Sequence, residues 1–229
     1  MSAPATPPAH RVFGSFRVAA PLCMCRSPSS WATGRENHEG VACADGEGVW
    51  RYPASADTVS PLYVQALIGY EDRWFDYHPG VNPFALARAA GQWLRSGGIV
   101  SGGSTLTMQV ARILDGRDTR SAGGKLRQMA RALQLEARLS KAQILQLYLE
   151  RAPFGGTIEG VDAASWAYLG KPAARLSHAE AALLGGLPQA PSGLRPDRHP
   201  QAARRARDKV LARMRLAQAH PRAQRIDTT

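Results

Sequence analysis

The sequence predicts a mainly α-helical domain, and three observations support this fold class. Apolar residues recur at helical spacing through most of the chain after residue 60. Typical helix starts precede these stretches, namely Ser60-Pro61, Asn82-Pro83 and the capping-box pattern Ser177-x-x-Glu180. Alternating strand patterns are nearly absent from the sequence. We therefore expect helices, with at most a small extended piece or two.

The expected elements follow one another in a simple order. A short extended segment, GVWRYP (48–53), leads into the domain. The first three helices are a segment from Pro61 through Leu67 and Tyr70, FALARAAGQWLRS after Asn82-Pro83, and LTMQVARIL after the glycine-rich SGGST. Residues 125–139 then place five apolar residues on one helical face: Leu126, Met129, Ala130, Leu133 and Ala137. The remaining helices are KAQILQLYLE, with Ser140 as cap and Ile144, Leu147 and Tyr148 on one face, AALLGGL after the capping box, and a basic helix from Pro200 to about Ala217.

The composition is typical of one globular domain with tails. The chain has 229 residues, of which 44% are hydrophobic and 21% charged, which is enough to bury a core. Residues 1–45 are rich in Pro, Ser, Ala and Gly without a sustained period, so we expect a disordered or atypical segment. The domain itself is expected over residues 46–217, followed by a tail at 218–229.

The positive charge is concentrated near the C-terminus. The formal net charge is +11, and residues 195–225 hold ten Arg or Lys against two Asp. This run fits a solvated face, or attraction to anionic lipid headgroups, to phosphate-bearing substrates or to nucleic acid. Aromatic residues interleaved with the basic ones would favour nucleic acid, and this run contains none. We therefore expect no nucleic-acid partner.

Cysteine usage and hydropathy exclude other classes. Cys23, Cys25 and Cys43 form no CxxC pair, which argues against a zinc site or a disulfide framework. No run of 18 apolar residues occurs, so nothing in the sequence is expected to span a membrane. Residues 11–25 have a basic start and an apolar middle, but Arg17 and Pro21 interrupt them, which argues against a signal peptide.

EDRWFDYHPG (71–80) places two carboxylates directly after an apolar helix. At the end of such a helix Glu71 can border apolar side chains while facing a cleft, and Trp74 and Phe75 could supply those walls. Partial desolvation would raise the pKa of Glu71 and make it a usable general base or acid. The alternative is an ordinary surface pair of carboxylates, and the residues alone leave both interpretations open.

SGGSTLTMQ (101–109) is the second unusual stretch. Two glycines let the backbone approach a ligand, and hydroxyls at a helix start favour an anion such as phosphate. Basic residues follow within 25 positions: Arg112, Arg117, Arg120, Lys125 and Arg127. Together they predict a pyrophosphate site. The alternatives are a simple helix cap and a helix with a basic outer face.

In their order, these motifs resemble glycosyltransferase family 51, the peptidoglycan polymerases of class A penicillin-binding proteins. EDRWFDYHPG resembles the first family signature, EDxxFxxHxG, and GGSTLTMQ resembles the second, GGSTxTQQ. GKLRQMARALQLEARLSKAQILQLYLERAPFGG resembles the third and fourth together, and HAEAALLGGLPQAPS the fifth. The match covers residues 46–217.

The resemblance implies a lysozyme-like helical fold with two lobes and a central cleft. It also implies the reaction: a 4-hydroxyl of lipid II attacks the anomeric carbon of a glycan on undecaprenyl pyrophosphate, with inversion. Glu71 matches the catalytic base. Ser104, Gln109, Arg112, Arg120 and Lys125 match positions that hold the donor's pyrophosphate, and Asp72, Phe75 and His78 match further substrate-site positions of the first motif.

The chain departs from the family pattern at a second functional position. Where the third motif, RKxxE, has a glutamate, the chain has Gln128, which keeps hydrogen bonding but loses the charge. We assign Gln128 to the catalytic site on this alignment. The family often uses a divalent cation (Mg or Mn) at the pyrophosphate, although the sequence shows no metal cluster of its own. Met108 replaces the first Gln of TQQ, and Glu150 replaces the Asn of YLN.

The resemblance also predicts location and partners. Family members act at the outer, periplasmic face of the inner membrane and can work beside other cell-wall synthesis proteins. The transpeptidase motifs SxxK, SxN and KTG and an anchor helix are not found in these residues, so we expect a truncated or frame-disrupted copy. An apolar patch around Trp93, Leu94 and residues 154–170 is expected to touch the bilayer.

Two other functions stay open. A catalytically impaired fragment could bind glycan or a partner as a scaffold, and Gln128 favours this reading. A lysozyme-like lytic enzyme would need an acid for the glycosidic oxygen and no pyrophosphate cradle. The GGST turn with Arg112, Arg120 and Lys125 argues against that enzyme.

Overall fold

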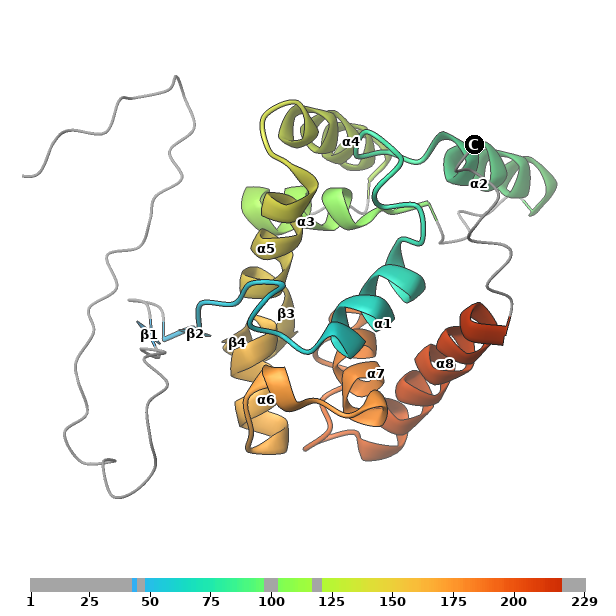
Figure 1. Cartoon of the computed structure of the whole chain (residues 1–229). Helices are drawn as coiled ribbons and strands as arrows, with labels where there is room; N and C mark the ends of the chain where they lie inside the picture. The colour runs from blue at the N-terminus through green and yellow to red at the C-terminus, as the bar shows by residue number, and fades with distance from the viewer. Residues whose placement is uncertain (1–42, 45–47, 97–102, 117–120, 220–229) are drawn as a thin grey trace, which may run out of the picture.

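Eight α-helices and four short strands make up the residues that the computed structural model describes, which are 43–44, 48–96, 103–116 and 121–219 (Figure 1). The helices are α1 (Pro61–Glu71), α2 (Pro83–Ser96), α3 (Leu106–Asp115), α4 (Ala122–Glu136), α5 (Lys141–Arg151), α6 (Val161–Leu169), α7 (His178–Gly186) and α8 (Pro200–Ala219). Two 3₁₀ turns, η1 (Ala173–Arg175) and η2 (Leu187–Gln189), flank α7. The predicted mainly helical class is confirmed.

The helices form two lobes, with α5 between them (Figure 1). One lobe consists of α2, α3 and α4. The other consists of α1, α6, α7 and α8, in which α1, α7 and α8 pack against one another. Because α5 contacts α3 and α4 on one side and α6 on the other, it joins the lobes.

The four strands form one small sheet beside α6. They are β1 (Cys43–Ala44), β2 (Trp50–Arg51), β3 (Pro153–Gly155) and β4 (Ile158–Glu159), in the order β1-β2-β4-β3. β2 pairs in parallel with β4, whereas the two outer pairings are antiparallel. The predicted extended entry segment is therefore correct, because β2 lies within it. The predicted segment 1–45 otherwise lies outside the described residues, as does most of the tail 218–229.

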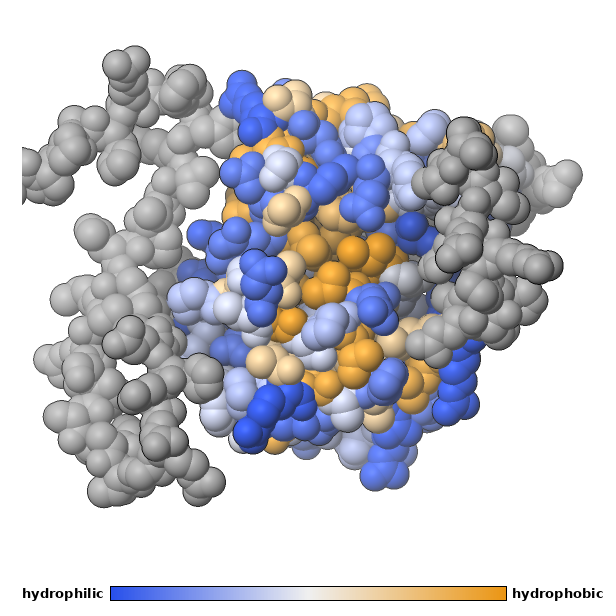
Figure 2. Space-filling view, in the orientation of Figure 1, coloured by the Kyte–Doolittle hydropathy of each residue, from blue (hydrophilic) through white to orange (hydrophobic). Residues whose placement is uncertain are grey.

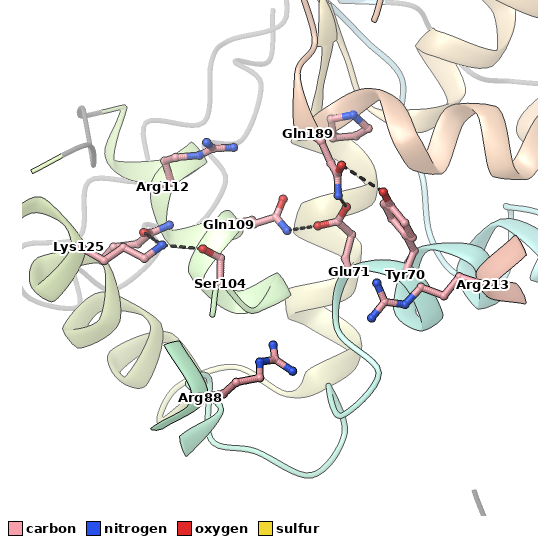
Figure 3. Close-up of a pocket in the computed structure, with 11 residues that line it drawn as sticks. Tyr70, Glu71, Arg88, Ser104, Gln109, Arg112, Lys125, Gln189 and Arg213 are labelled. Atoms are coloured by element: carbon pink, nitrogen blue, oxygen red, sulfur yellow. Dashed lines mark hydrogen bonds between the residues drawn. The ribbon is translucent and has the colours of Figure 1, made fainter. Parts of the chain in front are cut away.

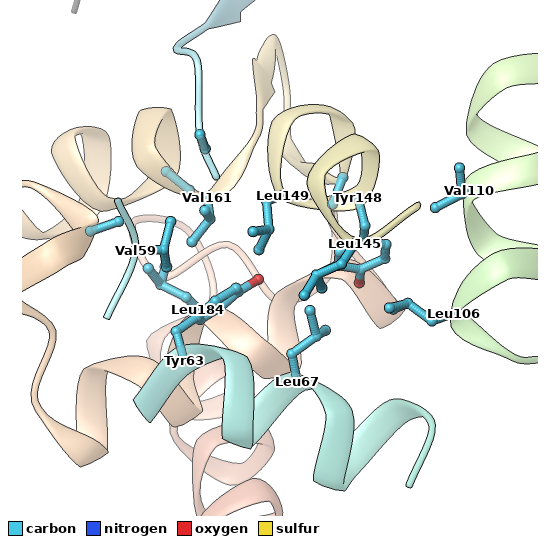
Figure 4. Close-up of a cluster of buried hydrophobic side chains, with 14 of the residues drawn as sticks. Val59, Tyr63, Leu67, Leu106, Val110, Leu145, Tyr148, Leu149, Val161 and Leu184 are labelled. Atoms are coloured by element: carbon cyan, nitrogen blue, oxygen red, sulfur yellow. The ribbon is translucent and has the colours of Figure 1, made fainter. Parts of the chain in front are cut away.

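One apolar cluster fills the space between α1, α5 and α7 and reaches α3 (Figure 4). Tyr63 and Leu67 of α1 face Tyr148 of α5, and Leu106 and Val110 extend the cluster into the other lobe. Tyr63, Leu67, Leu106 and Tyr148 are fully buried. Burial of large side chains contributes about 1.5–3 kcal/mol each, so this cluster holds the two lobes together.

Most predicted helix starts are confirmed. Pro61 is the first residue of α1, and the Asn82 side chain accepts a hydrogen bond from the Ala85 N–H at the start of α2. Ser140 and Gln143 form a capping box at α5. Ser60 differs from the expectation, because its hydroxyl donates to the carbonyl of Leu176 and does not cap α1.

The apolar face that the sequence shows on α4 is not the buried one. Leu126 is 66% exposed and Leu133 47% exposed, whereas Gln128, Ala132 and Leu135 are buried. The reason is that α4 packs on α3 through the face that carries these three residues. Figure 2 shows hydrophobic residues at the surface over α4, at the top of the view, and a second group in the middle of this face.

Among the described helices, none has the length and hydropathy that a bilayer crossing requires. The side chains of Trp93 and Leu94, expected in a membrane patch, lie outside the described part of the chain. Trp166 on α6, inside the other predicted part of that patch, is 44% exposed.

Candidate active site

Glu71 is the last residue of α1 and faces a cavity of about 730 Å³ between the two lobes (Figure 3). One wall comes from α1, η2 and α8, and the other from α2, α3 and α4. The polar residues that line this cavity are Tyr70, Glu71, Arg88, Ser104, Gln109, Arg112, Lys125, Gln128, Gln189 and Arg213. Six of the ten predicted site residues are therefore brought together here: Glu71, Ser104, Gln109, Arg112, Lys125 and Gln128.

The Glu71 carboxylate accepts one hydrogen bond on each oxygen. Gln109 Nε2 donates to Oε2 at 2.7 Å, and Gln189 Nε2 donates to Oε1 at 2.9 Å. Burial raises the pKa of Glu71, and the nearby Asp72 adds to this, whereas the two amide donors and Arg213 lower it. The net direction is upward, which suits a carboxylate that must take a proton near neutral pH.

A second cavity, of about 400 Å³, meets the first at Glu71. Both are lined by Tyr70, Glu71, Arg88, Ser104 and Arg213. The second also takes in the aromatic side chains of Trp74 and Phe84, which are 39% and 85% exposed. Glu71 therefore borders both cavities, so a ligand in either one can come close to its carboxylate.

Lys125 organises the polar group on the α3–α4 side. Its Nζ donates to Ser104 Oγ at 2.6 Å and to Gln128 Oε1 at 3.0 Å. Gln128 is buried, and its Nε2 donates to the carbonyl of Met108 at 2.6 Å. Burial, and then the neighbouring Arg112, lower the pKa of Lys125. An anion that entered here would relieve the repulsion between these two cations.

The other predicted cations are placed differently. Arg112 lines the first cavity, close to Lys125 in Figure 3. Arg120, a predicted pyrophosphate ligand, and Arg117 lie outside the described residues. Arg127 is exposed on α4 and does not line either cavity.

Asp72 and His78 attach the loop between α1 and α2, which carries the first motif, to the lobe formed by α2, α3 and α4. Asp72 is buried and accepts hydrogen bonds from His78 Nε2 and from the backbone N–H of Leu106, each at 2.9 Å. Leu106 is the first residue of α3, where free N–H groups favour a carboxylate. The structure thus gives both residues a structural contact, and Asp72 also borders the second cavity. Their predicted contacts with substrate stay predictions.

The prediction that Phe75 forms an apolar wall of the cleft is wrong. It is 1% exposed and belongs to the main core, and Lys141 Nζ lies 4.6 Å from its ring centroid. Its ring lines neither cavity, so it cannot contact a substrate in this structure. An aromatic residue four positions after Glu71 points away from the cleft once the helix has ended at residue 71. Of the two aromatic residues predicted for this wall, Trp74 borders the second cavity and Phe75 does not.

Sequence reasoning missed four residues of the site: Tyr70, Arg88, Gln189 and Arg213. Gln189 lies within LPQAPS, a stretch that carries the family resemblance, but nothing marks its side chain as a partner of Glu71. Arg213 belongs to the basic run of the C-terminus, and its guanidinium lies 5.7 Å from the Tyr70 ring centroid. Because residues three apart share a face of a helix, Arg213 lies beside the buried Val210 on α8, and the charge of the run alone could not single it out.

A family model described as transglycosylase matches residues 39–215, which is most of the chain. The chain belongs to the transglycosylase family. It is 66% identical over 171 residues to penicillin-binding protein 1C of Escherichia coli (strain K12), covering 75% of this chain and 22% of that protein. It is 42% identical to penicillin-binding protein 1A of Pseudomonas aeruginosa, covering 72% and 20%. The chain thus spans about a fifth of the length of these curated relatives.

Within the transglycosylase family, three stretches predict the 1C subtype: SGGSTLTMQVAR, RAPFGG and LPQAPSGLRPDR. The identity to penicillin-binding protein 1C agrees with this prediction. A crystal structure of penicillin-binding protein 1A from Haemophilus influenzae aligns with a TM-score of 0.40 and 20% identity, over 74% of this chain and 17% of that one. That likeness is too distant to bear on the fold.

The transglycosylase resemblance allows a divalent cation at this cavity, but the described residues do not bring a cluster of metal ligands together there. Hard cations need several oxygen ligands, preferably carboxylates. In the described residues no group of three or more His, Cys, Asp or Glu is placed to hold a metal. Near Ser104, the carboxamide oxygen of Gln128 already accepts from Lys125. The positive charge at this position comes from Lys125 and Arg112.

Proposed function

We propose that the chain is a peptidoglycan glycosyltransferase domain that polymerises lipid II into glycan strands, with Glu71 as the general base. The observation that carries the proposal is the place of Glu71: a desolvated carboxylate where a cation-lined cavity meets a second cavity. A base at such a junction can reach an acceptor hydroxyl while the donor's leaving group occupies the cationic side. Membership of the transglycosylase family supports the same reaction class.

In the proposed reaction, the acceptor's 4-hydroxyl attacks the anomeric carbon of the donor glycan. Glu71 takes the hydroxyl proton as the new C–O bond forms. The bond from the anomeric carbon to the undecaprenyl pyrophosphate breaks, and its electron pair leaves with the pyrophosphate oxygen. Lys125 and Arg112 stabilise the negative charge that develops there, and Ser104 offers its hydroxyl beside them. The configuration at the anomeric carbon inverts.

Gln128 contributes in this proposal without carrying charge. Its carboxamide holds Lys125 against Ser104 and ties α4 to the Met108 carbonyl of α3. It therefore orients the cation that meets the pyrophosphate. No step of the reaction is assigned to a metal ion.

The proposed setting is the outer, periplasmic face of the bacterial inner membrane, where lipid-linked donor and acceptor are held. Cell-wall synthesis proteins are the partners that this setting predicts. The exposed apolar side chains of α4 and Trp166 of α6 support contact with a bilayer. Flotation with anionic liposomes at moderate salt is the test, and absence of binding would contradict the membrane contact.

The carboxylates argue against a lytic enzyme. In the described part of the chain, Glu71 and Asp72 are the acidic residues that line the two cavities, and Asp72 is committed to His78 and Leu106. A glycosidase of the common type needs a separate acid and base or nucleophile. The scaffold alternative predicts binding of lipid-linked glycan without turnover.

The test is polymerisation of labelled lipid II by the purified chain. We expect glycan strands from the parent and a loss of about 10²–10⁴-fold in rate for Glu71→Gln, because the base is removed. Glu150→Gln is the matched control, since Glu150 on α5 pairs with Gln146 and lines neither cavity. Binding without polymer from a folded parent would favour the scaffold instead.

A further inference from the structure

Glu71 is held by carboxamides that come from both lobes. Gln109 belongs to α3, whereas Gln189 is the last residue of η2, on the far side of the cleft (Figure 3). Each donates to a different carboxylate oxygen, at 2.7 and 2.9 Å. Two donors on two oxygens fix the plane of the carboxylate and the direction in which its free lone pairs point.

The orientation of the Gln189 amide is fixed by its two neighbours. An ionised carboxylate only accepts hydrogen bonds, so the NH₂ group of Gln189 must face Glu71. The amide oxygen then faces the Tyr70 hydroxyl, which donates to it at 3.3 Å. Tyr70 precedes Glu71 on α1, so the helix itself places both groups that Gln189 contacts.

We propose that Gln189 is a positioning residue for Glu71, oriented by Tyr70, and that it sets the geometry and the basicity of that carboxylate. The proposal rests on the proposed function, in which Glu71 is the base. It goes beyond it by assigning a role to a residue 118 positions away in the sequence.

The basicity of Glu71 depends on the fact that Gln189 carries no charge. Burial raises the pKa of Glu71, and the Gln109 and Gln189 amides partly offset this rise. A cation in place of Gln189 would favour the ionised form more strongly, and an anion would disfavour it. The other charged or titratable groups near Glu71 are Tyr63 of α1, Asp72 directly after α1, Arg88 of α2, Arg112 of α3, Lys125 of α4, Tyr148 of α5 and Arg213 of α8.

Charge variants at this position therefore have opposite expected effects. In Gln189→Lys, the acid limb of the pH profile of kcat/KM should move down by about one pH unit, and in Gln189→Glu it should move up by about one. Gln189→Met, which keeps the length but loses both polar groups, should lower kcat about tenfold with KM little changed. A merely structural role would not move the limb in opposite directions for the two charges.

A surface pair supplies the matched control. Gln146 donates to the carboxylate of Glu150 at 3.0 Å on the exposed side of α5, so it repeats the same contact outside the site. Gln146→Lys and Gln146→Glu should leave the pH profile unchanged. Tyr70→Phe should lose part of what Gln189→Met loses and cause no further loss when the two are combined, because the hydroxyl acts through the amide.

A second readout does not depend on activity. The pKa of Glu71, followed by the ¹³C chemical shift of its carboxyl carbon, should fall in Gln189→Lys and rise in Gln189→Glu. If the parent makes no polymer but these shifts occur, the proposed function fails and the positioning role stands. If the parent polymerises and the folded variants leave both the carboxyl titration and the acid limb unchanged, the positioning role is overturned.

Discussion

In the proposed reaction, Glu71 must be desolvated enough to be basic and still be ionised when substrate binds. Its burial at the end of α1 raises its pKa, and amide donors limit the rise. The unprotonated form is the active one in the proposed reaction, so the rate should fall as the pH drops through the raised pKa.

We therefore expect the acid limb of kcat/KM for polymerisation to lie above pH 4.5, the ordinary value for this carboxyl. Initial rates between pH 4.5 and 8 with short-chain lipid II would measure it. A limb at or below the ordinary value would show that burial does not control this group.

At this scale the sequence predicted the members of the site better than their contacts. Five predicted residues do line one cavity, because each belongs to a short sequence motif that marks its position in the site: Glu71, Ser104, Gln109, Lys125 and Gln128. Their chemical roles stay predictions. Gln189 could not be found, since its contact with Glu71 depends on how η2 meets α1. Phe75 was misjudged because an aromatic residue near a carboxylate fits a cleft wall and a core equally well.

The motif loop between α1 and α2 is held by a glycine against α4. Gly80 has a φ of +87°, and a Cβ there would lie 2.8 Å from the Ala132 carbonyl oxygen and 2.8 Å from Glu136 Cγ. Gly80→Ala should lower the free energy of unfolding by roughly 1–3 kcal/mol through strain and close contact. Urea unfolding followed by circular dichroism would measure this loss.

Gly123 on α4 is the control for that substitution. A Cβ there meets nothing within 4 Å, and the residue is helical. Gly123→Ala should raise the stability by about 0.5–1 kcal/mol, because alanine is the better helix former. Equal effects at the two glycines would contradict the close packing of the loop on α4.

The start of α7 depends on Glu180. Its carboxylate accepts from the Ser177 N–H at 2.8 Å, from the Ser177 hydroxyl at 2.6 Å and from Lys171 Nζ at 2.6 Å. The Lys171 and Ser177 hydrogen bonds lower the pKa of Glu180 to about 2, from the ordinary 4.5.

Because the folded-state pKa is depressed, the stabilisation is present above pH 4.5 and is lost as the pH falls toward about 2. Glu180→Gln should therefore cost about 0.5–1 kcal/mol at pH 7, a value limited by solvent screening, and nothing near pH 2. Thermal unfolding of parent and variant across this range is the measurement. A constant difference at all pH values would rule out the ionic origin.

Helix positions followed closely from the sequence, whereas the direction of a helix face did not. Caps and first-turn prolines are local signals, so α1, α2, α5 and α7 begin where predicted. On α4 the apolar residues Leu126 and Leu133 are exposed, and the polar Gln128 is buried because it meets the Met108 carbonyl and Lys125. Hydrophobic periodicity could not reveal that the buried face of α4 carries Gln128, because polar contacts and not apolar packing bury this side chain.

At the scale of the whole molecule, the main apolar cluster of the described residues spans both lobes. Leu106 and Val110 of α3 belong to the same cluster as Tyr63 of α1 and Tyr148 of α5. The two lobes should therefore unfold together, in one transition. Far-UV circular dichroism and tryptophan fluorescence should give the same urea midpoint, and two separate midpoints would show independent lobes.

The two-lobed arrangement itself was predicted from the family resemblance and not from periodicity, which carries no information on how helices are assembled.

The contact between Asp72 and the Leu106 N–H has a mechanical consequence. It joins the lobe that contains α1 to the lobe that contains α3 directly beside Glu71, and the shared apolar cluster continues that attachment along α5. With these two attachments, we expect the lobes to move as one body beside Glu71. In the proposed reaction, a growing glycan would then pass along a cleft of fixed width after each addition, which would favour repeated additions over release.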